Sequence, residues 1–153
     1  MANNYSQITI QAIFAVKYRE HFILKNWRDR LHQYIAGTID SKGGKTLAVG
    51  GWKDHVHALF GMPVITSIAY FIGTLKSNSS RWVNDQNFVK GHFEWQKGYG
   101  AFSYSKDQRD VLIKYIMNQE THHQGISFKE EFISLLNDFE IEFDSKYLFK
   151  FFD

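Results

Sequence analysis

The sequence predicts a single α+β domain with a ferredoxin-like, split βαβ sheet. Its 153 residues match the usual size of one domain, and 44% hydrophobic with 22% charged residues is ordinary globular composition. Segments rich in β-branched and aromatic residues alternate with segments of helical periodicity. Their order is β-α-β-β-α-β-α followed by a helical extension, and the first six elements form the split βαβ pattern.

The first part of the chain predicts a strand, a helix and a β-hairpin. Residues 7–18 are β-branched and aromatic with partial alternation, which is typical of a strand. Residues 26–41 carry apolar side chains at helical spacing. Residues 47–52 and 55–62 read as two strands joined by a two-residue corner, so we expect a hairpin there.

The middle of the chain predicts a second helix and short strands. Residues 65–84 have helical periodicity, but their centre, KSNSSR (76–81), is polar and a weak helix former. We therefore expect the helix to be irregular at that point. Residues 93–95 and 101–104 are short strand candidates on either side of a glycine-containing turn.

The last part of the chain predicts two further helices. Residues 106–123 show the best-defined helical period, and residues 128–139 form an amphipathic helix. We expect one domain over 1–153, with a core of about 7–125 and a C-terminal extension over 126–153. In this topology helices cover one face of the antiparallel sheet, and we expect the other face to be free for a partner or substrate.

Composition excludes several classes of protein. Cysteine is absent, which excludes disulfides and thiolate metal sites and fits a reducing cytoplasm. No apolar run approaches the roughly 18 residues needed to span a membrane, and the first six residues lack signal-peptide features. The net charge is only +2, but acidic residues concentrate after residue 119. A mildly basic body remains that can present a basic face to nucleic acid.

The segment GWKDHVHALF contains two histidines, His55 and His57, separated by one valine. In a strand they point to the same side, while Val56 points to the core. Two imidazoles placed in this way can share a divalent metal. The alternative is two solvated histidines. The apolar residues that follow make a buried strand credible, and buried imidazoles need a ligand or hydrogen-bond partners.

The helix predicted over 106–123 carries a second polar pair. Tyr115 and Gln119 are four residues apart and therefore share one helix face. A helical tyrosine is usually a core residue, but a buried glutamine amide must find partners. Tyr99 and Tyr104 are also expected near this region, and only the helical setting and the spacing to Gln119 favour Tyr115.

Together these segments resemble the HUH nucleases. They are most similar to the small single-tyrosine transposases of bacterial insertion sequences and to their relatives associated with repetitive extragenic palindromes (REP). His55 and His57 stand where the family has its HUH motif, Tyr115 where it has its nucleophile, and Gln119 where it has a third metal ligand. WQKGYGAFSYS (95–105) and KYR (17–19) also resemble family segments.

The resemblance implies a DNA transposase that cleaves and rejoins single-stranded DNA at hairpin-bearing element ends. Tyr115 would be the catalytic residue and form a 5′-phosphotyrosine intermediate. His55, His57 and Gln119 would bind the metal, Mg²⁺ or Mn²⁺. The partners implied are hairpin-bearing single-stranded DNA and a second copy of the chain, in a homodimer with active sites shared between subunits. The expected location is the bacterial cytoplasm, at the nucleoid.

Basic residues near the expected site are candidate DNA contacts, although solvated surface charges explain them equally well. They are Lys17, Arg19, Lys53, Lys76 and Arg81. Two other functions remain open. A non-catalytic ferredoxin-like domain would bind single-stranded nucleic acid by stacking and need no metal. A metal-dependent hydrolytic nuclease would use the same histidines with water as the nucleophile.

Overall fold

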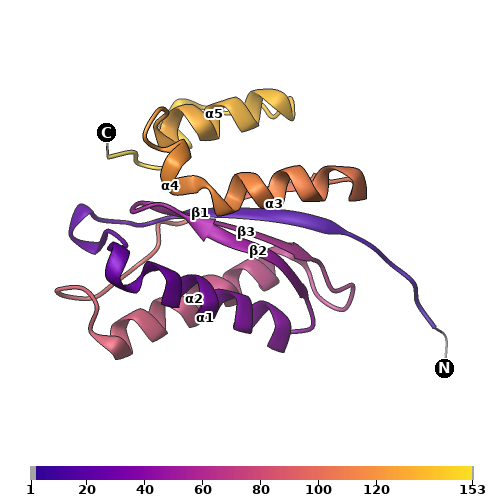
Figure 1. Ribbon diagram of the computed structural model, residues 1–153, viewed down its shortest axis with the longest axis horizontal. Helices are drawn as coiled ribbons and strands as arrows, with labels where there is room; N and C mark the ends of the chain where they lie inside the picture. The colour runs from indigo at the N-terminus through magenta and orange to yellow at the C-terminus, as the bar shows by residue number, and fades with distance from the viewer. Residues whose placement is uncertain (1–2, 153) are drawn as a thin grey trace.

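The computed structural model describes residues 3–152, which form a four-stranded sheet flanked by helices (Figure 1). The strands are β1 (Thr9–Ala15), β2 (Lys45–Gly51), β3 (His55–Gly61) and β4 (Gly100–Tyr104). They lie in the order β2-β3-β1-β4, and every neighbouring pair is antiparallel. The predicted α+β class and its antiparallel, split βαβ sheet are confirmed.

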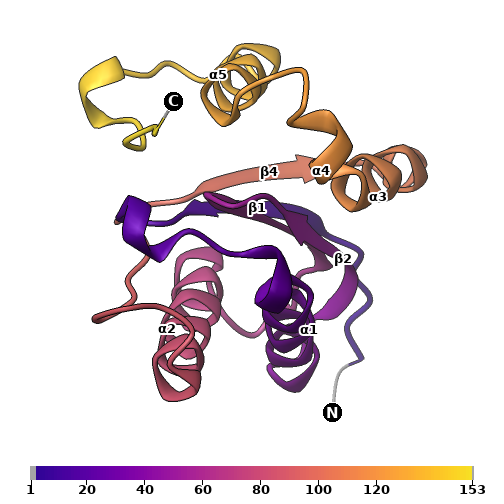
Figure 2. The same cartoon turned by 60° about the vertical axis from the view of Figure 1, so that its left-hand side comes forward.

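Helices α1 (Lys25–Ser41) and α2 (Ile68–Gln86) cover one face of this sheet (Figure 2). Alternate residues of each strand point to that face, so β1 and β3 contribute every second side chain to a buried core. The strands supply Phe14, Val56, Ala58 and Phe60, and the helices supply Trp27, Leu31, Ile35, Ile39, Phe71, Ile72 and Leu75.

The expectation that the other face is free was wrong. Helices α3 (Arg109–Met117), α4 (Gln119–His122) and α5 (Phe128–Asp138) lie over it (Figures 1 and 2). The reason is that the second face of the central strands carries the apolar Ile13, Ala15 and Leu59 beside its polar residues, so this face also needs cover. On the second face α5 and the C-terminal segment bury Ile13, Ala15 and Phe102 with Phe128, Phe132, Leu136 and Phe149.

The helix predicted over residues 106–123 is broken into three pieces. A 3₁₀ turn (η2, Lys106–Gln108) precedes α3, and Asn118 separates α3 from α4 with a non-helical φ of −104° and ψ of 22°. Residues 93–95 do not form a regular strand either, because only Trp95 pairs there, with Val16. The chain changes direction at Asn118, and this change directs Gln119 into the interior.

Helix α2 is continuous through KSNSSR, so the predicted irregularity was wrong. The polar side chains of this stretch bind the loop before β4. Ser79 Oγ accepts a hydrogen bond from Trp95 Nε1 at 3.0 Å, and Lys76 Nζ donates to the carbonyl oxygens of Gln96 and Gly98 at 2.8 and 2.7 Å. These partners compensate for the weak helix propensity of the stretch.

Two further 3₁₀ turns complete the chain, η1 (Arg19–His21) after β1 and η3 (Ser145–Tyr147) near the C-terminus. Within residues 3–152 the longest helices are too short or too polar to cross a bilayer. The expectation about a signal peptide falls partly on residues 1–2, which lie outside the described residues.

Candidate active site

Strand β3 places both histidines of the HVH segment on the face covered by α3, α4 and α5. His55 and His57 are completely buried, and their ring centres are 5.0 Å apart. Val56 points the other way and joins the core beneath α1 and α2. The predicted orientation of the three side chains is therefore confirmed, but the imidazoles lie in the protein interior and not on an open surface.

Each imidazole is oriented by a hydrogen bond from its Nδ1 atom. His55 Nδ1 donates to Asp54 Oδ1 and His57 Nδ1 donates to Gln11 Oε1, both at 2.7 Å. His123, just after α4, donates from Nδ1 to a backbone carbonyl oxygen at 2.8 Å. With one proton on Nδ1, each Nε2 atom faces the centre of the site, where it can bind a metal ion once it carries no second proton.

The Nε2 atoms meet side-chain oxygens. His57 Nε2 lies 3.0 Å from Glu131 Oε1, and His55 Nε2 lies 3.1 Å from Gln119 Oε1 and 3.2 Å from Glu131 Oε1. His123 Nε2 lies 2.8 Å from Gln119 Oε1. Lone pairs that face one another repel unless a proton or a cation lies between them. This donor set therefore fits a metal ion, and the ligand atoms of His55, His57 and Glu131 lie within 4.8 Å of one another.

Glu131 connects this cluster to Tyr115. The Tyr115 hydroxyl donates a hydrogen bond to Glu131 Oε2, and Gln119 Nε2 donates to the same oxygen at 3.1 Å. His122 Nε2 lies 3.0 Å from Tyr115 Oη. The two residues predicted to share a helix face thus meet at one carboxylate, although they lie on α3 and α4. Both belong to the chain that also supplies the histidines.

Burial and charge set the protonation of these groups. Burial lowers the pKa of His55, but hydrogen bonds to Asp54 and Glu131 outweigh it and raise this pKa to about 9. Burial dominates at His57 and lowers its pKa. Although burial raises the pKa of the Glu131 carboxyl, the surrounding imidazoles hold it far below its usual value. Burial and the charge of Glu131 raise the pKa of Tyr115, so its hydroxyl stays protonated.

Two cavities lead towards these residues. A cavity of about 800 Å³ between α3 and α5 reaches Tyr115, His122 and Glu131, and its walls are mostly apolar. A cavity of about 280 Å³ lies by the β2–β3 turn and is bounded by Asp54 and His123. Phe128, which lines the smaller of these cavities, stacks on the His55 ring with centroids 3.9 Å apart.

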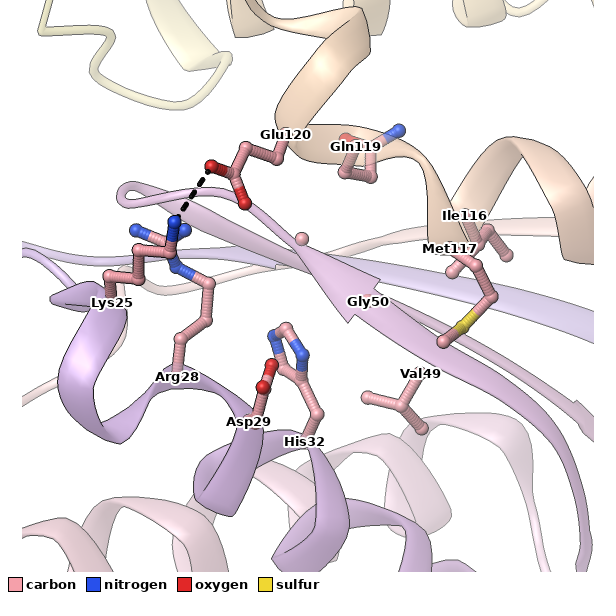
Figure 3. A pocket seen from close by; sticks show the side chains of 11 residues that line it. Lys25, Arg28, Asp29, His32, Val49, Gly50, Ile116, Met117, Gln119 and Glu120 are labelled. Carbon is pink, nitrogen blue, oxygen red and sulfur yellow. Dashed lines mark hydrogen bonds and ion pairs between the residues drawn. The ribbon is translucent and has the colours of Figure 1, made fainter.

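A third cavity, of about 140 Å³, lies at the edge of β2, and Gln119 forms part of its wall (Figure 3). Lys25 and Glu120 form an ion pair of 3.4 Å across this region. His32 projects into it from α1, and its buried Nε2 atom has no hydrogen-bond partner among the described residues.

A model of the family described as IS200-like transposases matches residues 4–119. The chain belongs to this family. The match includes both histidines of β3, Tyr115 and Gln119, and it ends before α5. No curated protein matches the chain significantly.

Two solved structures share the fold of this IS200-like transposase. A candidate transposase from Deinococcus radiodurans is 24% identical, with a TM-score of 0.60 over 78% of this chain and 96% of that chain. A REP-associated tyrosine transposase bound to a REP hairpin is 12% identical, with a TM-score of 0.58 over 82% of this chain and 74% of that chain.

The predicted DNA contacts are not all near the active site. Lys17 pairs with Glu94 at 3.0 Å, Arg19 donates to the carbonyl oxygen of Phe152, and Lys53 lies at the β2–β3 turn. Lys76 and Arg81 lie on α2, which covers the opposite face of the sheet. Lys76 also uses its ammonium group on two backbone carbonyls, and burial lowers its pKa.

The sequence left open whether His122 and His123 contact the site or lie at a solvated helix end, and three other residues of the site were not predicted as members. Asp54 directly precedes the predicted His55, and that adjacency was the available signal. Gln11 is a polar residue within an apolar strand, a pattern that implies a buried partner. Glu131 carries no such signal, because it is one of several acidic residues in an amphipathic helix beyond the family match.

Proposed function

We propose that this IS200-like transposase cleaves and rejoins single-stranded DNA at hairpin-bearing element ends, with Tyr115 as the nucleophile. The observation that carries the proposal is the meeting of Tyr115, Gln119 and the two β3 histidines at Glu131. The family and the REP hairpin bound to a structural relative support DNA as the substrate.

In the proposed reaction Tyr115 Oη attacks the scissile phosphorus. The Oη–P bond forms, the bond from phosphorus to the 3′ oxygen breaks, and a 5′-phosphotyrosine and a free 3′-hydroxyl result. The covalent link conserves the phosphodiester bond, so a different 3′-hydroxyl can reverse the step and join new ends. Glu131 Oε2 already accepts the Tyr115 hydrogen bond and would orient the hydroxyl for attack, and the proton that Oη loses balances the one that the released 3′ oxygen takes up.

His55, His57, Gln119 and Glu131 would hold the divalent metal, Mg²⁺ or Mn²⁺, with His123 beside them. The metal would polarise the non-bridging oxygens of the phosphate. Asp54 and Gln11 keep the two β3 imidazoles in the tautomer that can bind a metal. The mixture of imidazole and oxygen ligands suits Mn²⁺ better than Mg²⁺.

The cavity between α3 and α5 is the proposed entrance for the scissile phosphate, because it reaches Tyr115 and Glu131. Joining two ends after two cuts requires two nucleophiles, so we propose a homodimer. The sheet leaves two outer strands, β2 and β4, for pairing between copies. We also propose that residues 1–153 act as one unit and that the protein works in the cytoplasm on cellular DNA.

The test uses single-stranded oligonucleotides that tile the DNA flanking the gene, labelled at either end, with Mn²⁺ or Mg²⁺. We expect a denaturation-resistant adduct that retains the 3′ label, because a 5′-phosphotyrosine stays on the downstream fragment. Tyr115→Phe abolishes the adduct, and the matched control Tyr99→Phe retains it. His57→Ala abolishes cleavage but retains hairpin binding.

Two results would overturn the proposal. Cleavage that survives Tyr115→Phe indicates a hydrolytic nuclease that uses water. Binding with no adduct on any tile, with or without metal, indicates a non-catalytic binding domain.

A further inference from the structure

Aromatic rings and cations gather at one end of the sheet. Lys53 Nζ lies 5.4 Å from the centre of the Phe22 ring, while the Arg19 guanidinium and Lys150 Nζ lie 5.7 and 5.6 Å from the centre of the Phe152 ring. The two phenylalanine rings meet edge to face with centroids 5.4 Å apart. We call these five residues the basic-aromatic surface.

Three distant segments build this surface, namely the turn after β1, the β2–β3 turn and the C-terminal segment (Figure 1). The backbone N–H of Ile23 donates to the Lys53 carbonyl oxygen at 2.7 Å, and Arg19 Nη2 donates to the Phe152 carbonyl oxygen at 2.7 Å. Gln96 binds both backbone groups of Lys150, each at 2.8 Å. These contacts fix the rings and cations relative to one another.

The cations of this surface remain available to bind an anion. Arg19, Lys53 and Lys150 are exposed, and among residues 3–152 no carboxylate lies within 4 Å of any of them. Lys17 nearby differs, because Glu94 neutralises it. A cation–π contact leaves the cation free to bind a phosphate, and the half-buried Phe22 and Phe152 keep part of their rings exposed.

The basic-aromatic surface continues into the active site. Lys53 also lines the 280 Å³ cavity, together with Trp52, Asp54 and His123. Asp54 orients His55, and the Arg28 guanidinium lies 4.8 Å from the centre of the Trp52 ring. A chain bound along the surface therefore reaches Asp54 and His123, which contact the candidate metal ligands His55 and Gln119.

We propose that the basic-aromatic surface binds a single-stranded DNA segment beside the active site, with phosphates on Arg19, Lys53 and Lys150 and bases stacked on Phe22 and Phe152. A single strand offers both charged phosphates and accessible base faces. A duplex hides those faces, and an acidic peptide lacks them. The inference rests on the proposed function for the class of substrate.

The charge of the surface is tested by fluorescence anisotropy with a labelled dT12 oligonucleotide in EDTA, where cleavage cannot interfere. We expect Lys53→Gln/Lys150→Gln to bind about tenfold more weakly, with a salt dependence reduced by about 0.7 per lost phosphate contact. The control Lys42→Gln/Lys45→Gln makes the same charge change at the other end of β2. Equal losses in both double variants, or none in the first, overturn the proposal.

The rings are tested with an oligonucleotide of the same length that contains abasic sites. Wild type is expected to prefer dT12 by about tenfold, within the range for stacking of a base on an aromatic ring. Phe22→Leu/Phe152→Leu keeps the apolar volume and is expected to lose most of this preference. Its thermal denaturation confirms that it folds. If wild type binds dT12 and the abasic oligonucleotide equally well, the rings do not stack on bases. The same conclusion follows if wild type binds a duplex as tightly as dT12.

These measurements separate the inference from the proposed function. Binding in EDTA does not require cleavage, whereas the phosphotyrosine adduct does. If wild type forms the adduct but the surface variants bind dT12 as tightly as wild type, the DNA-binding role of the surface is rejected and the proposed reaction stands. If wild type forms no adduct but the surface variants bind dT12 more weakly, the proposed reaction is rejected and the DNA-binding role of the surface stands.

Discussion

The hydroxyl of Tyr115 donates a hydrogen bond to Oε2 of Glu131, which connects a helix inside the family match to a helix outside it. Glu131 is buried on α5, which packs on the sheet through Phe128, Phe132 and Leu136. The C-terminal extension is thus part of the site, because it supplies a negative charge at the centre of a group of imidazoles.

The first prediction concerns this charge. Glu131→Gln keeps the shape of the side chain but removes the carboxylate that four imidazole Nε2 atoms face, those of His55, His57, His122 and His123. We expect the dissociation constant for Mn²⁺, measured by isothermal titration calorimetry, to rise by about tenfold or more. Glu130→Gln, on the exposed side of the same helix, is the matched control and is expected to bind like wild type. An unchanged affinity in Glu131→Gln removes Glu131 from the metal site.

The second prediction concerns the packing of β2 against α3, the helix that carries Tyr115. Gly50 in β2 lies directly beneath α3, and a Cβ atom there would clash with the carbonyl oxygen of Ile116. We expect Gly50→Ala to lower the free energy of unfolding by about 1–3 kcal/mol in urea denaturation, because a backbone atom has to move. Gly73→Ala, on α2, meets no atom within 4 Å and is expected to stabilise the helix by up to about 1 kcal/mol. A neutral Gly50→Ala would show that α3 shifts freely on the sheet.

Local patterns predicted the sheet, α1, α2 and the paired histidines, because strand alternation and helical periodicity are read over a few residues. The helices that cover the second face of the sheet were not predicted to lie there, because their position depends on contacts between α5 and strands that are distant in the sequence. Asn118 illustrates the limit of prediction from local sequence patterns. The apolar spacing predicted one helix through it, but α3 ends at Met117 and Asn118 has a non-helical conformation. Glu131 was missed for the same reason, since only tertiary structure distinguishes it from exposed acidic neighbours.

The third prediction concerns the polar stretch of α2. Ser79 Oγ is the partner of the nearly buried Trp95 Nε1, so Ser79→Ala leaves an indole N–H unpaired in the interior. We expect this to cost about 1–3 kcal/mol of unfolding free energy. Ser77→Ala, two residues earlier on the exposed side, removes only a local bond to Thr74 and is expected to change stability by less than about 0.5 kcal/mol. Similar values for both variants would mean that the Trp95 bond contributes nothing.

The fourth prediction concerns pH. Burial lowers the pKa of His32 from 6.5 to about 4, and Arg28 adds to the effect while Asp29 opposes it. Below pH 6.5 the unfolded chain binds a proton that the folded chain does not, so folding loses stability as the pH falls from 6.5 towards 4. Above pH 6.5 this loss is absent, and below pH 4 it no longer grows.

We therefore expect His32→Gln, which cannot titrate, to gain stability relative to wild type as the pH falls through this window. The gain approaches about 3 kcal/mol near pH 4, since one pKa unit corresponds to about 1.4 kcal/mol. Urea denaturation of both proteins at pH 7.5, 6, 5 and 4 measures the difference, and His92→Gln, in an exposed loop, is the control. If the difference between His32→Gln and wild type stays constant across these pH values, the pKa of His32 is the same in the folded and unfolded chains, and the burial of His32 is not responsible for a loss of stability in acid.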